Sequence, residues 1–228
     1  MTILESTQLE STQLESMPVE VTEREVALDV VYVGRAAMPV EAGEFTAHAF
    51  DLGAHTHLVL TMGDLSSVAA PLVRLHSECL TGDALRSQRC DCGSQLQAAL
   101  TRIADEGVGA VIYLAGHEGR GIGLAEKIRA YALQDDGADT VDANVFLGHD
   151  ADLRDYTPAV SVLEWFGVEA VRLLTNNPAK AAALEEQGIR VAALEPHHGM
   201  VTEHNRAYLE TKRDRMGHEL AELAARHA

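Results

Sequence analysis

The segment from residue 94 to residue 195 alternates helical stretches with short apolar runs. In SQLQAALTRIADEG, residues 94–107, Leu96, Leu100 and Ile103 share one helix face and Gly107 ends the helix. VGAVIYLAG (108–116), EAVRLLTNN (169–177) and IRVAAL (189–194) follow the pattern of buried strands. Strand–helix–strand units of this kind form a mostly parallel sheet covered by helices on both faces. The sequence predicts an α/β fold with three αβα layers and a mixed, largely parallel sheet.

Three further stretches of this segment are predicted helices. GLAEKIRAYALQDDG (123–137) has Leu124, Ile128 and Ala132 in helical register. YTPAVSVLEWFG (156–167) offers Thr157 as the N-cap, a proline in the first turn and a glycine at the end. NPAKAAALEEQG (177–188) repeats the asparagine–proline start and the glycine stop.

A small antiparallel β section is predicted to precede this part, between residues 26 and 73. Its strand-like runs are EFTAHAFDLG (44–53), HTHLVLTMGD (55–64) and APLVRLHSE (70–78), separated by glycine and proline. Residues 1–25 contain the polar, acidic repeat LESTQLESTQLES and are predicted to be a disordered, low-complexity N-terminus. The chain then divides into a main domain over residues 26–205 and a charged, helical C-terminal tail over residues 206–228.

Composition excludes several classes of function. With 18 Lys and Arg against 35 Asp and Glu, the formal net charge is −17, which disfavours nucleic acid as a partner. A small phosphorylated substrate stays compatible, because it needs only a few local cations. No apolar run approaches the roughly 18 residues of a membrane span, and the first residues lack the features of a signal peptide. We therefore expect a cytoplasmic protein that does not bind membranes.

The chain has three cysteines, Cys79, Cys90 and Cys92, close together in sequence. They fit a metal site, a redox device or three unconnected core residues, although the two-residue spacer of a thiol-exchange motif is missing. Three thiolates leave the fourth position of a zinc ion to water, the arrangement of a catalytic site. His76, three residues before Cys79, would instead close the set and make the zinc structural. The cysteines alone leave these alternatives open.

Several long motifs of the chain resemble the GTP cyclohydrolase II family of riboflavin synthesis. They are, in order, VRLHSECLTGD, RCDCGSQLQAAL, HEGRGIGLAEKIRAYALQDDGADTVDAN, LGHDADLRDY, RLLTNNPAK and YLETKRDRMGH. The resemblance runs from about residue 37 to residue 218 and makes residues 26–205 a GTP cyclohydrolase II-like catalytic domain. It implies a zinc enzyme that opens the imidazole ring of GTP at C8. Formate and pyrophosphate leave, giving 2,5-diamino-6-ribosylamino-4(3H)-pyrimidinone 5′-phosphate.

The resemblance also implies roles for individual residues. Zinc would be held by Cys79, Cys90 and Cys92, with His76 outside its ligand shell. Tyr131 would serve ring opening, and Asp152 and Arg154 would be the proton acceptor and the nucleophile at the phosphate. The implied substrate-binding residues are Arg74, His76, Ser77, Glu78, Gln95, Glu118, Gly119, Arg120, Thr140, Thr175 and Lys180. Mg²⁺ is expected to accompany the triphosphate, and relatives of this kind are typically homodimers.

Part of this chemistry is reasonable from the residues themselves. The glycine-rich loop GHEGRGIGL (116–124) is either a plain turn or a cradle of backbone N–H groups for an anion. Arg154 could bind phosphate bidentately beside Asp152, and its high pKa favours charge stabilisation over nucleophilic attack. On ordinary expectations this pair would be a surface ion pair, Tyr131 a half-buried core residue and Lys180 a solvent-exposed side chain. For His197 and His198 we expect only structural roles.

Two positions depart from the family pattern. Relatives commonly carry arginine where this chain has Ala115, and AALEPHH (192–198) replaces their Glu-Arg-Val-Pro-Leu sequence. The loss of a cation at residue 115 leaves open a paralogue that retains the formyl group or uses another guanine nucleotide. A further alternative, from a different class, is a non-catalytic nucleotide-binding zinc protein.

Overall fold

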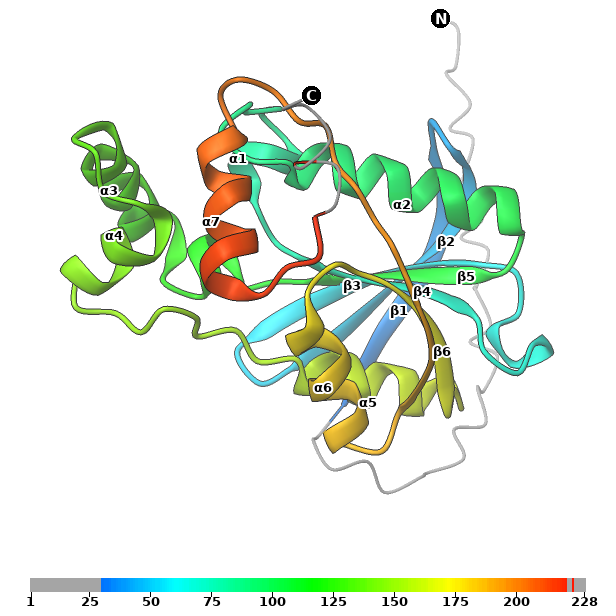
Figure 1. The fold of residues 1–228 in the computed structure, drawn as a ribbon. Helices are drawn as coiled ribbons and strands as arrows, with labels where there is room; N and C mark the ends of the chain where they lie inside the picture. Colours follow the sequence, from blue (N-terminus) through cyan, green and yellow to red (C-terminus); the bar gives the residue numbers. More distant parts are fainter. Residues whose placement is uncertain (1–29, 221–222, 224–228) are drawn as a thin grey trace, which may run out of the picture.

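A computed structural model describes residues 30–220 and residue 223, so the predicted disordered N-terminus, residues 1–25, lies outside the described residues. One seven-stranded sheet forms the centre (Figure 1). In spatial order its strands are β1 (Val31–Val40), β2 (Gly43–Leu52), β3 (His55–Met62), β5 (Gly109–Leu114), β4 (Leu72–Ser77), β6 (Ala170–Leu174) and β7 (Arg190–Glu195). The α/β class and the mixed sheet predicted from the sequence are confirmed.

The strand pairing of the sheet changes from antiparallel to parallel at β5. Strands β1, β2, β3 and β5 pair antiparallel, whereas β5, β4, β6 and β7 pair parallel. The predicted antiparallel section is therefore continuous with the rest of the sheet. Its third run was placed wrongly, because β4 pairs in parallel with β5 and β6. The apolar pattern of β4 showed that it is a strand, but its partners follow later in the chain and the pattern does not name them.

Helices cover both faces of the sheet and complete the three layers (Figure 1). Helix α2 (Cys92–Glu106) packs Leu100 and Ile103 against β2, β3 and β5 on one face. It ends as predicted at Gly107, which has a φ of 79° and whose N–H bonds to Ile103. Helices α5 (Thr157–Trp165) and α6 (Pro178–Glu186) cover the opposite face. The N-cap of α5 is Tyr156, one residue before the predicted Thr157, and Asn177 caps α6 as expected.

The remaining helices gather beyond the carboxyl ends of β4, β5 and β6 (Figure 1). They are α1 (Leu80–Asp83), α3 (Gly123–Asp135), α4 (Thr140–Phe146) and α7 (Arg206–Met216). On α3 the apolar register noted in the sequence faces outward, with Leu124 41% and Ile128 51% exposed. The opposite side of α3, with Lys127 and Ala130, is buried. Because ligands of open α/β sheets bind outside the carboxyl ends of parallel strands, this group of helices surrounds the expected position of a site.

Candidate active site

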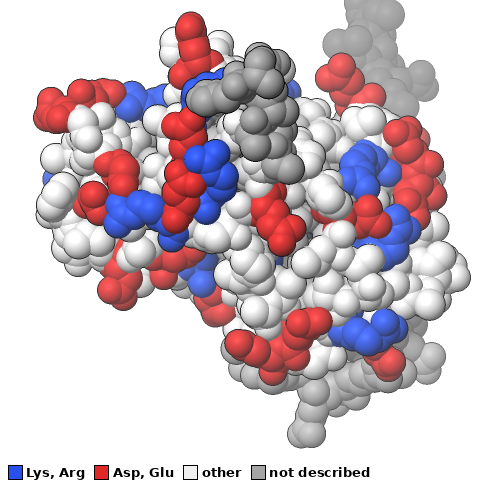
Figure 2. Space-filling model, in the orientation of Figure 1, with Lys and Arg blue, Asp and Glu red and all other residues white. Residues whose placement is uncertain are grey.

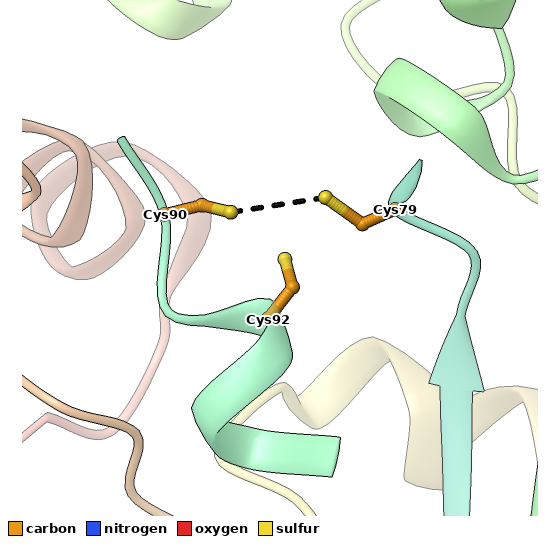
Figure 3. A group of neighbouring side chains, drawn as sticks. All are labelled: Cys79, Cys90 and Cys92. Carbon is orange, nitrogen blue, oxygen red and sulfur yellow. Dashed lines mark hydrogen bonds between the residues drawn. The ribbon is translucent and has the colours of Figure 1, made fainter. Parts of the chain in front are cut away.

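The three cysteines converge between the end of β4 and the start of α2. Cys79 lies between β4 and α1 as the N-cap of α1, Cys90 lies two residues before α2, and Cys92 is the first residue of α2. Their sulfur atoms point toward one another (Figure 3) and lie within 4.8 Å of one another. Cys79 and Cys90 Sγ are 3.7 Å apart. No other group of three or more metal-binding side chains is this close among the described residues.

The space between the sulfurs fits a single metal ion and depends on Gly82. A Cβ atom at Gly82 would lie 2.8 Å from Cys90 Sγ and 3.1 Å from Cys79 Sγ. Gly93 is equally constrained, since its Cβ would meet the Gly82 carbonyl oxygen at 2.2 Å. Two close-packed glycines therefore let α1 and α2 approach and keep the cradle open. Three sulfur donors suit zinc and leave one tetrahedral position free.

His76 does not close this set. Its Nε2 lies 3.0 Å from the Asp83 carboxylate, and its ring stacks on Tyr113 at 5.4 Å. Asp83 also accepts hydrogen bonds from the Cys79 N–H (3.0 Å) and the Tyr113 hydroxyl (2.9 Å). The reading in which His76 completes a structural zinc site is therefore not supported. His76 acts through Asp83, which fixes the backbone at the first cysteine.

Lys127, on α3, contributes a buried positive charge beside the cysteines. Its ammonium donates to Cys79 Sγ at 3.1 Å and to Thr81 Oγ1 at 2.9 Å, and it pairs with the Glu118 carboxylate. Glu118 in turn accepts the Leu80 N–H at 2.7 Å. Both side chains of the Lys127–Glu118 pair are 8% exposed. A buried charge is tolerated only when it is paired, so this pair ties α3 to the first cysteine.

The surroundings shift the pKa values of the thiols. Hydrogen bonds from Cys90 and Cys92, together with the nearby charge of Lys127, hold the pKa of Cys79 far below that of a free thiol. The hydrogen bond that the Cys90 thiol donates to Cys79 raises the pKa of Cys90 to about 11. Cys79 is therefore a thiolate at neutral pH, which is the form in which cysteine binds metal ions.

A first pocket, the cysteine pocket, opens above the three sulfurs. Its empty volume is about 640 Å³, including the part open to solvent. Tyr131 lines it, with the hydroxyl 3.5 Å from Thr81 Oγ1 and the Arg89 guanidinium 4.5 Å from the ring centre. Burial raises the pKa of Tyr131, so its hydroxyl stays protonated. Tyr131 is half-buried, as expected, but it lies on a pocket wall. Other predicted site residues on this wall are Ser77, Glu78, Glu118, Gly119, Arg120, Thr140 and Arg154.

Three backbone N–H groups of the glycine-rich loop are already bonded within the protein. The N–H of Arg120 bonds to the His117 carbonyl at 3.1 Å, that of Gly121 to the Glu118 carbonyl at 3.0 Å, and that of Gly116 to Glu78 at 2.8 Å. These amides are therefore unavailable to an anion. Arg120 has a φ of 67°, an uncommon conformation for a residue with a side chain. Its guanidinium bonds to the carbonyl and hydroxyl of Thr140 and lines both pockets described here.

Asp152 and Arg154 form a two-point ion pair at the pocket margin. Arg154 Nε and Nη2 donate to the two oxygens of Asp152 at 2.8 and 2.5 Å. The Arg154 side chain is 12% exposed, so this is no ordinary surface pair. Despite burial, the hydrogen bonds that Arg154 donates to the Asp152 carboxylate raise the pKa of Arg154, and the guanidinium stays charged. Asp152 is not among the residues that line the pockets, but it orients Arg154, which lines both.

A second pocket, the basic pocket, adjoins the first and has an empty volume of about 580 Å³. No Asp or Glu lines it among the described residues, whereas Arg74, Arg120, Arg154, Lys180 and Lys212 all do. Lys180 is 5% exposed and bonds to the Leu75 carbonyl at 2.7 Å, so the expectation of solvent exposure was wrong. Burial and the neighbouring cations lower its pKa well below that of a free lysine. Among the predicted substrate residues, His76, Gln95 and Thr175 also line this pocket.

Arg74 and Gln95 connect the basic pocket to the sheet and to α2. Arg74 donates to the Leu174 carbonyl at 2.8 Å and to Gln95 Oε1 at 2.6 Å, and burial lowers its pKa to about 10. Gln95 donates to Asp91, between the second and third cysteines, at 2.7 Å. This chain of bonds links the positive wall of the basic pocket to the cysteine loop.

Sequence reasoning missed several residues of the site. They are Asp83, Arg89, Asp91, His117, Lys127, Tyr208, Lys212 and His218. Lys127 was open to prediction, because it lies four residues before Tyr131 on one helix face. Ala115 lines neither pocket, and its N–H donates to His57 Nδ1 at 3.2 Å. His197 has the structural role expected, with Nε2 bonded to the Gln95 carbonyl at 2.8 Å.

The positive groups of the basic pocket contrast with the outer surface. On the face drawn in Figure 2, basic side chains lie beside acidic ones, and no extended basic patch is seen. Within the part of the chain that the structure describes, no helix is both long enough and apolar enough to cross a membrane.

Comparison with known proteins agrees with this geometry. The family model of GTP cyclohydrolase II matches residues 31–196. The chain belongs to the GTP cyclohydrolase II family. It is 53% identical over 195 residues to the GTP cyclohydrolase-2 of Pseudomonas putida, covering 85% of this chain and 95% of that protein. It is also 53% identical over 197 residues to the enzyme of the same name from Saccharophagus degradans, covering 86% and 98%.

The family makes this chain a hydrolase of the GTP cyclohydrolase II type. A solved structure, a two-domain 3,4-dihydroxy-2-butanone 4-phosphate synthase from A. baumannii, is similar with a TM-score of 0.43 and 18% identity. That match covers 77% of this chain and 41% of the other.

Proposed function

We propose that this chain is a zinc-dependent hydrolase that opens the imidazole ring of GTP at C8. In the proposed reaction formate and pyrophosphate leave, and 2,5-diamino-6-ribosylamino-4(3H)-pyrimidinone 5′-phosphate remains for riboflavin synthesis. The observation that carries the proposal is the adjacency of the two pockets, which share Ser77, Cys92, Arg120, Arg154 and Tyr208. A nucleoside triphosphate combines an uncharged base with a polyanion, and the two pockets match those halves.

Zinc is assigned to Cys79, Cys90 and Cys92, whose three sulfurs leave one position open. When bound, zinc would polarise a coordinated water or purine atom and so assist hydrolysis. Lys127 offsets part of the negative charge of three thiolates through its hydrogen bond to Cys79. Three thiolates would otherwise reduce the electron-withdrawing power of the ion, so Lys127 favours catalysis at this position.

Tyr131 is proposed to serve the ring-opening steps as a hydrogen-bond donor. It stands across the cysteine pocket on α3, near Thr81 and Lys127, and its hydroxyl is protonated at neutral pH. A protonated phenol can donate to a ring nitrogen or hold a water molecule for attack at the neighbouring carbon. This role requires contact with substrate, which a core tyrosine would not make.

Arg154 is proposed to stabilise developing negative charge at the phosphate, with Asp152 holding it in place. The two-point bond to Asp152 and the raised pKa both keep the guanidinium protonated. A protonated guanidinium has no free lone pair, so charge stabilisation is preferred over nucleophilic attack. Arg74, Arg120 and Lys180, which are among the implied substrate-binding residues, would bind the remaining phosphate oxygens, and Mg²⁺ would enter as part of the substrate complex. A homodimer and a cytoplasmic location stay predictions.

Turnover of GTP tests the proposal. Pure protein is incubated with GTP, zinc and magnesium, and formate, pyrophosphate and the pyrimidine are followed by mass spectrometry. We expect all three products from the wild type and a loss of at least about 1000-fold in rate for Cys90→Ser. A product heavier by one CO would indicate the formyl-retaining paralogue. Binding of GTP without any product would indicate the non-catalytic nucleotide-binding protein and overturn the proposal.

A further inference from the structure

The C-terminal helix supplies part of the wall of the basic pocket. Tyr208 and Lys212 on α7, and His218 just after it, line the pocket together with residues from β4 and α6. Tyr208 also lines the cysteine pocket, so α7 lies along the junction of the two. This helix is more than a cover, because it brings polar groups to the pocket itself.

The position of α7 is fixed by contacts at several points. Leu209 packs with Leu220 and Leu223 in a small apolar cluster. Arg215 pairs with Asp139 and Asp142 on α4, and the Glu219 N–H donates to the Asn176 carbonyl at 3.0 Å. The segment is therefore anchored both to α4 and to the turn before α6. Anchoring on both sides sets the direction of the side chains between them.

Lys212 is a nearly buried ammonium with donors to spare. Its side chain is 12% exposed, Nζ lies 3.0 Å from Asp91 Oδ1, and the Tyr208 ring centre is 4.3 Å away. An ammonium has three N–H donors, and the bond to Asp91 uses one of them. His218 Nε2 is also buried and has no hydrogen-bond partner within the part of the chain that the structure describes.

Arg74 adds a second unpaired donor to the same pocket. It is 5% exposed, and its Nε has no hydrogen-bond partner among the described residues. Buried donors without partners are rare in folded proteins, so two of them around one pocket, beside the spare donors of Lys212, indicate a polar ligand. Because no carboxylate lines the wall among the described residues, that ligand is an anion.

We propose that Lys212 and His218 bind the oligophosphate of the nucleotide directly, so that the C-terminal segment is part of the substrate site. The ligand class is a linear di- or triphosphate group, in which several charged oxygens meet several donors at once. The identity of the nucleoside rests on the proposed function, whereas the anion subsite does not.

Binding of magnesium tripolyphosphate tests this assignment without any turnover. Isothermal titration calorimetry on the full, zinc-loaded chain compares the wild type, Lys212→Met, His218→Ala and Arg213→Met. Arg213→Met is the matched control, since Arg213 lies on the same helix and pairs with Asp214 away from the pocket. We expect Lys212→Met to weaken tripolyphosphate binding by between about 10-fold and about 100-fold, as for other charge-assisted hydrogen bonds. His218→Ala should have a smaller effect, and Arg213→Met almost none.

Several results would overturn the assignment. An unchanged affinity in Lys212→Met, or an equal loss in Arg213→Met, would show that Lys212 does not contact the anion. If Lys212→Met loses its fold or its zinc, His218→Ala decides, because it leaves the Asp91 bond intact; unchanged affinity there contradicts the proposal. Lysine-dependent binding of tripolyphosphate by a chain that never opens GTP would overturn the proposed function alone. Normal KM for GTP in a folded Lys212→Met would overturn only the present assignment.

Discussion

The ammonium of Lys127 lies 3.1 Å from the sulfur of Cys79 and pairs at the same time with Glu118. One ammonium group therefore binds both the Cys79 sulfur, which follows β4, and the Glu118 carboxylate of the glycine-rich loop. This arrangement joins α3, which carries Tyr131, to the cysteine cluster. Partners that orient metal ligands affect metal affinity nearly as strongly as the ligands do.

Lys127→Met is expected to weaken both the fold and metal binding. The buried Glu118 carboxylate would lose its partner, at a cost of about 3–5 kcal/mol in the free energy of unfolding. Zinc affinity should fall by between about 10-fold and about 100-fold. Urea unfolding and zinc competition with a chelator measure the two effects. The control is Arg129→Met on the same helix, where the side chain is 70% exposed and a change within about 0.5 kcal/mol is expected. Equal effects of both substitutions would contradict this account.

Gly82→Ala is expected to remove metal binding by filling the cradle. The new Cβ would lie 2.8 Å from Cys90 Sγ, closer than any ordinary contact, while the backbone of Gly82 is not left-handed. The strain of overpacking costs about 1–3 kcal/mol, which the fold should survive. Zinc content after dialysis, measured by mass spectrometry, should fall far below one ion per chain. Full zinc content with wild-type affinity would show that the sulfurs do not enclose the ion.

Arg154→Lys keeps the positive charge but loses the two-point bond to Asp152. If Arg154 stabilises charge at the phosphate in a fixed orientation, kcat/KM for GTP should fall by between about 10-fold and about 100-fold. Asp152→Asn should give a similar but smaller loss, because it releases the guanidinium without removing it. Steady-state kinetics with far-ultraviolet circular dichroism as the folding control provide the measurement. Full activity of Arg154→Lys would exclude a role for the bidentate geometry.

Stability should decline as the pH falls below about 6.5. Burial, with Arg74 nearby, lowers the pKa of His197 to about 3, and burial with Arg154 nearby lowers that of His117 to about 4. Both side chains therefore stay neutral in the folded protein while the unfolded chain takes up protons below its own pKa. Their contribution is complete above pH 6.5 and is lost toward pH 4, by up to about 1.4 kcal/mol per pH unit for each.

His197→Gln isolates one of these histidines, since a glutamine can still donate to the Gln95 carbonyl. Urea unfolding of the variant at pH 7, 6 and 5 should give a shallower pH dependence than that of the wild type. Identical slopes for the two proteins would mean that His197 titrates normally.

Local sequence patterns predict most helices and strands and draw attention to the three cysteines, but they do not predict which distant segments pack together. Helix α2, its stop at Gly107 and the strands β5, β6 and β7 follow from local apolar periodicity and turn residues. The partner choice of β4 and the outward face of Leu124 and Ile128 on α3 depend on tertiary packing, which periodicity does not encode.

The same limit applies to the site. The cysteine spacing alone left a metal site, a redox device and unconnected core residues open. The structure brings the three sulfurs together beside the pocket that Tyr131 and Arg154 line. Lys212 lies 121 positions from Asp91, its partner, and no local pattern links the two. Lys180 is one of the implied substrate-binding residues, although a lone lysine in a first turn is ordinarily exposed. Only tertiary packing buries it and brings its Nζ to the Leu75 carbonyl.

The most direct test of the central claim follows the carbon at position 8 of the base. Wild-type protein with zinc and magnesium is given [8-¹³C]GTP, and ¹³C NMR follows the label while ³¹P NMR follows phosphate release. We predict that the label appears in free formate, together with an equal amount of pyrophosphate. Label retained in a formamide attached to the pyrimidine, or left in intact GTP, would contradict the account.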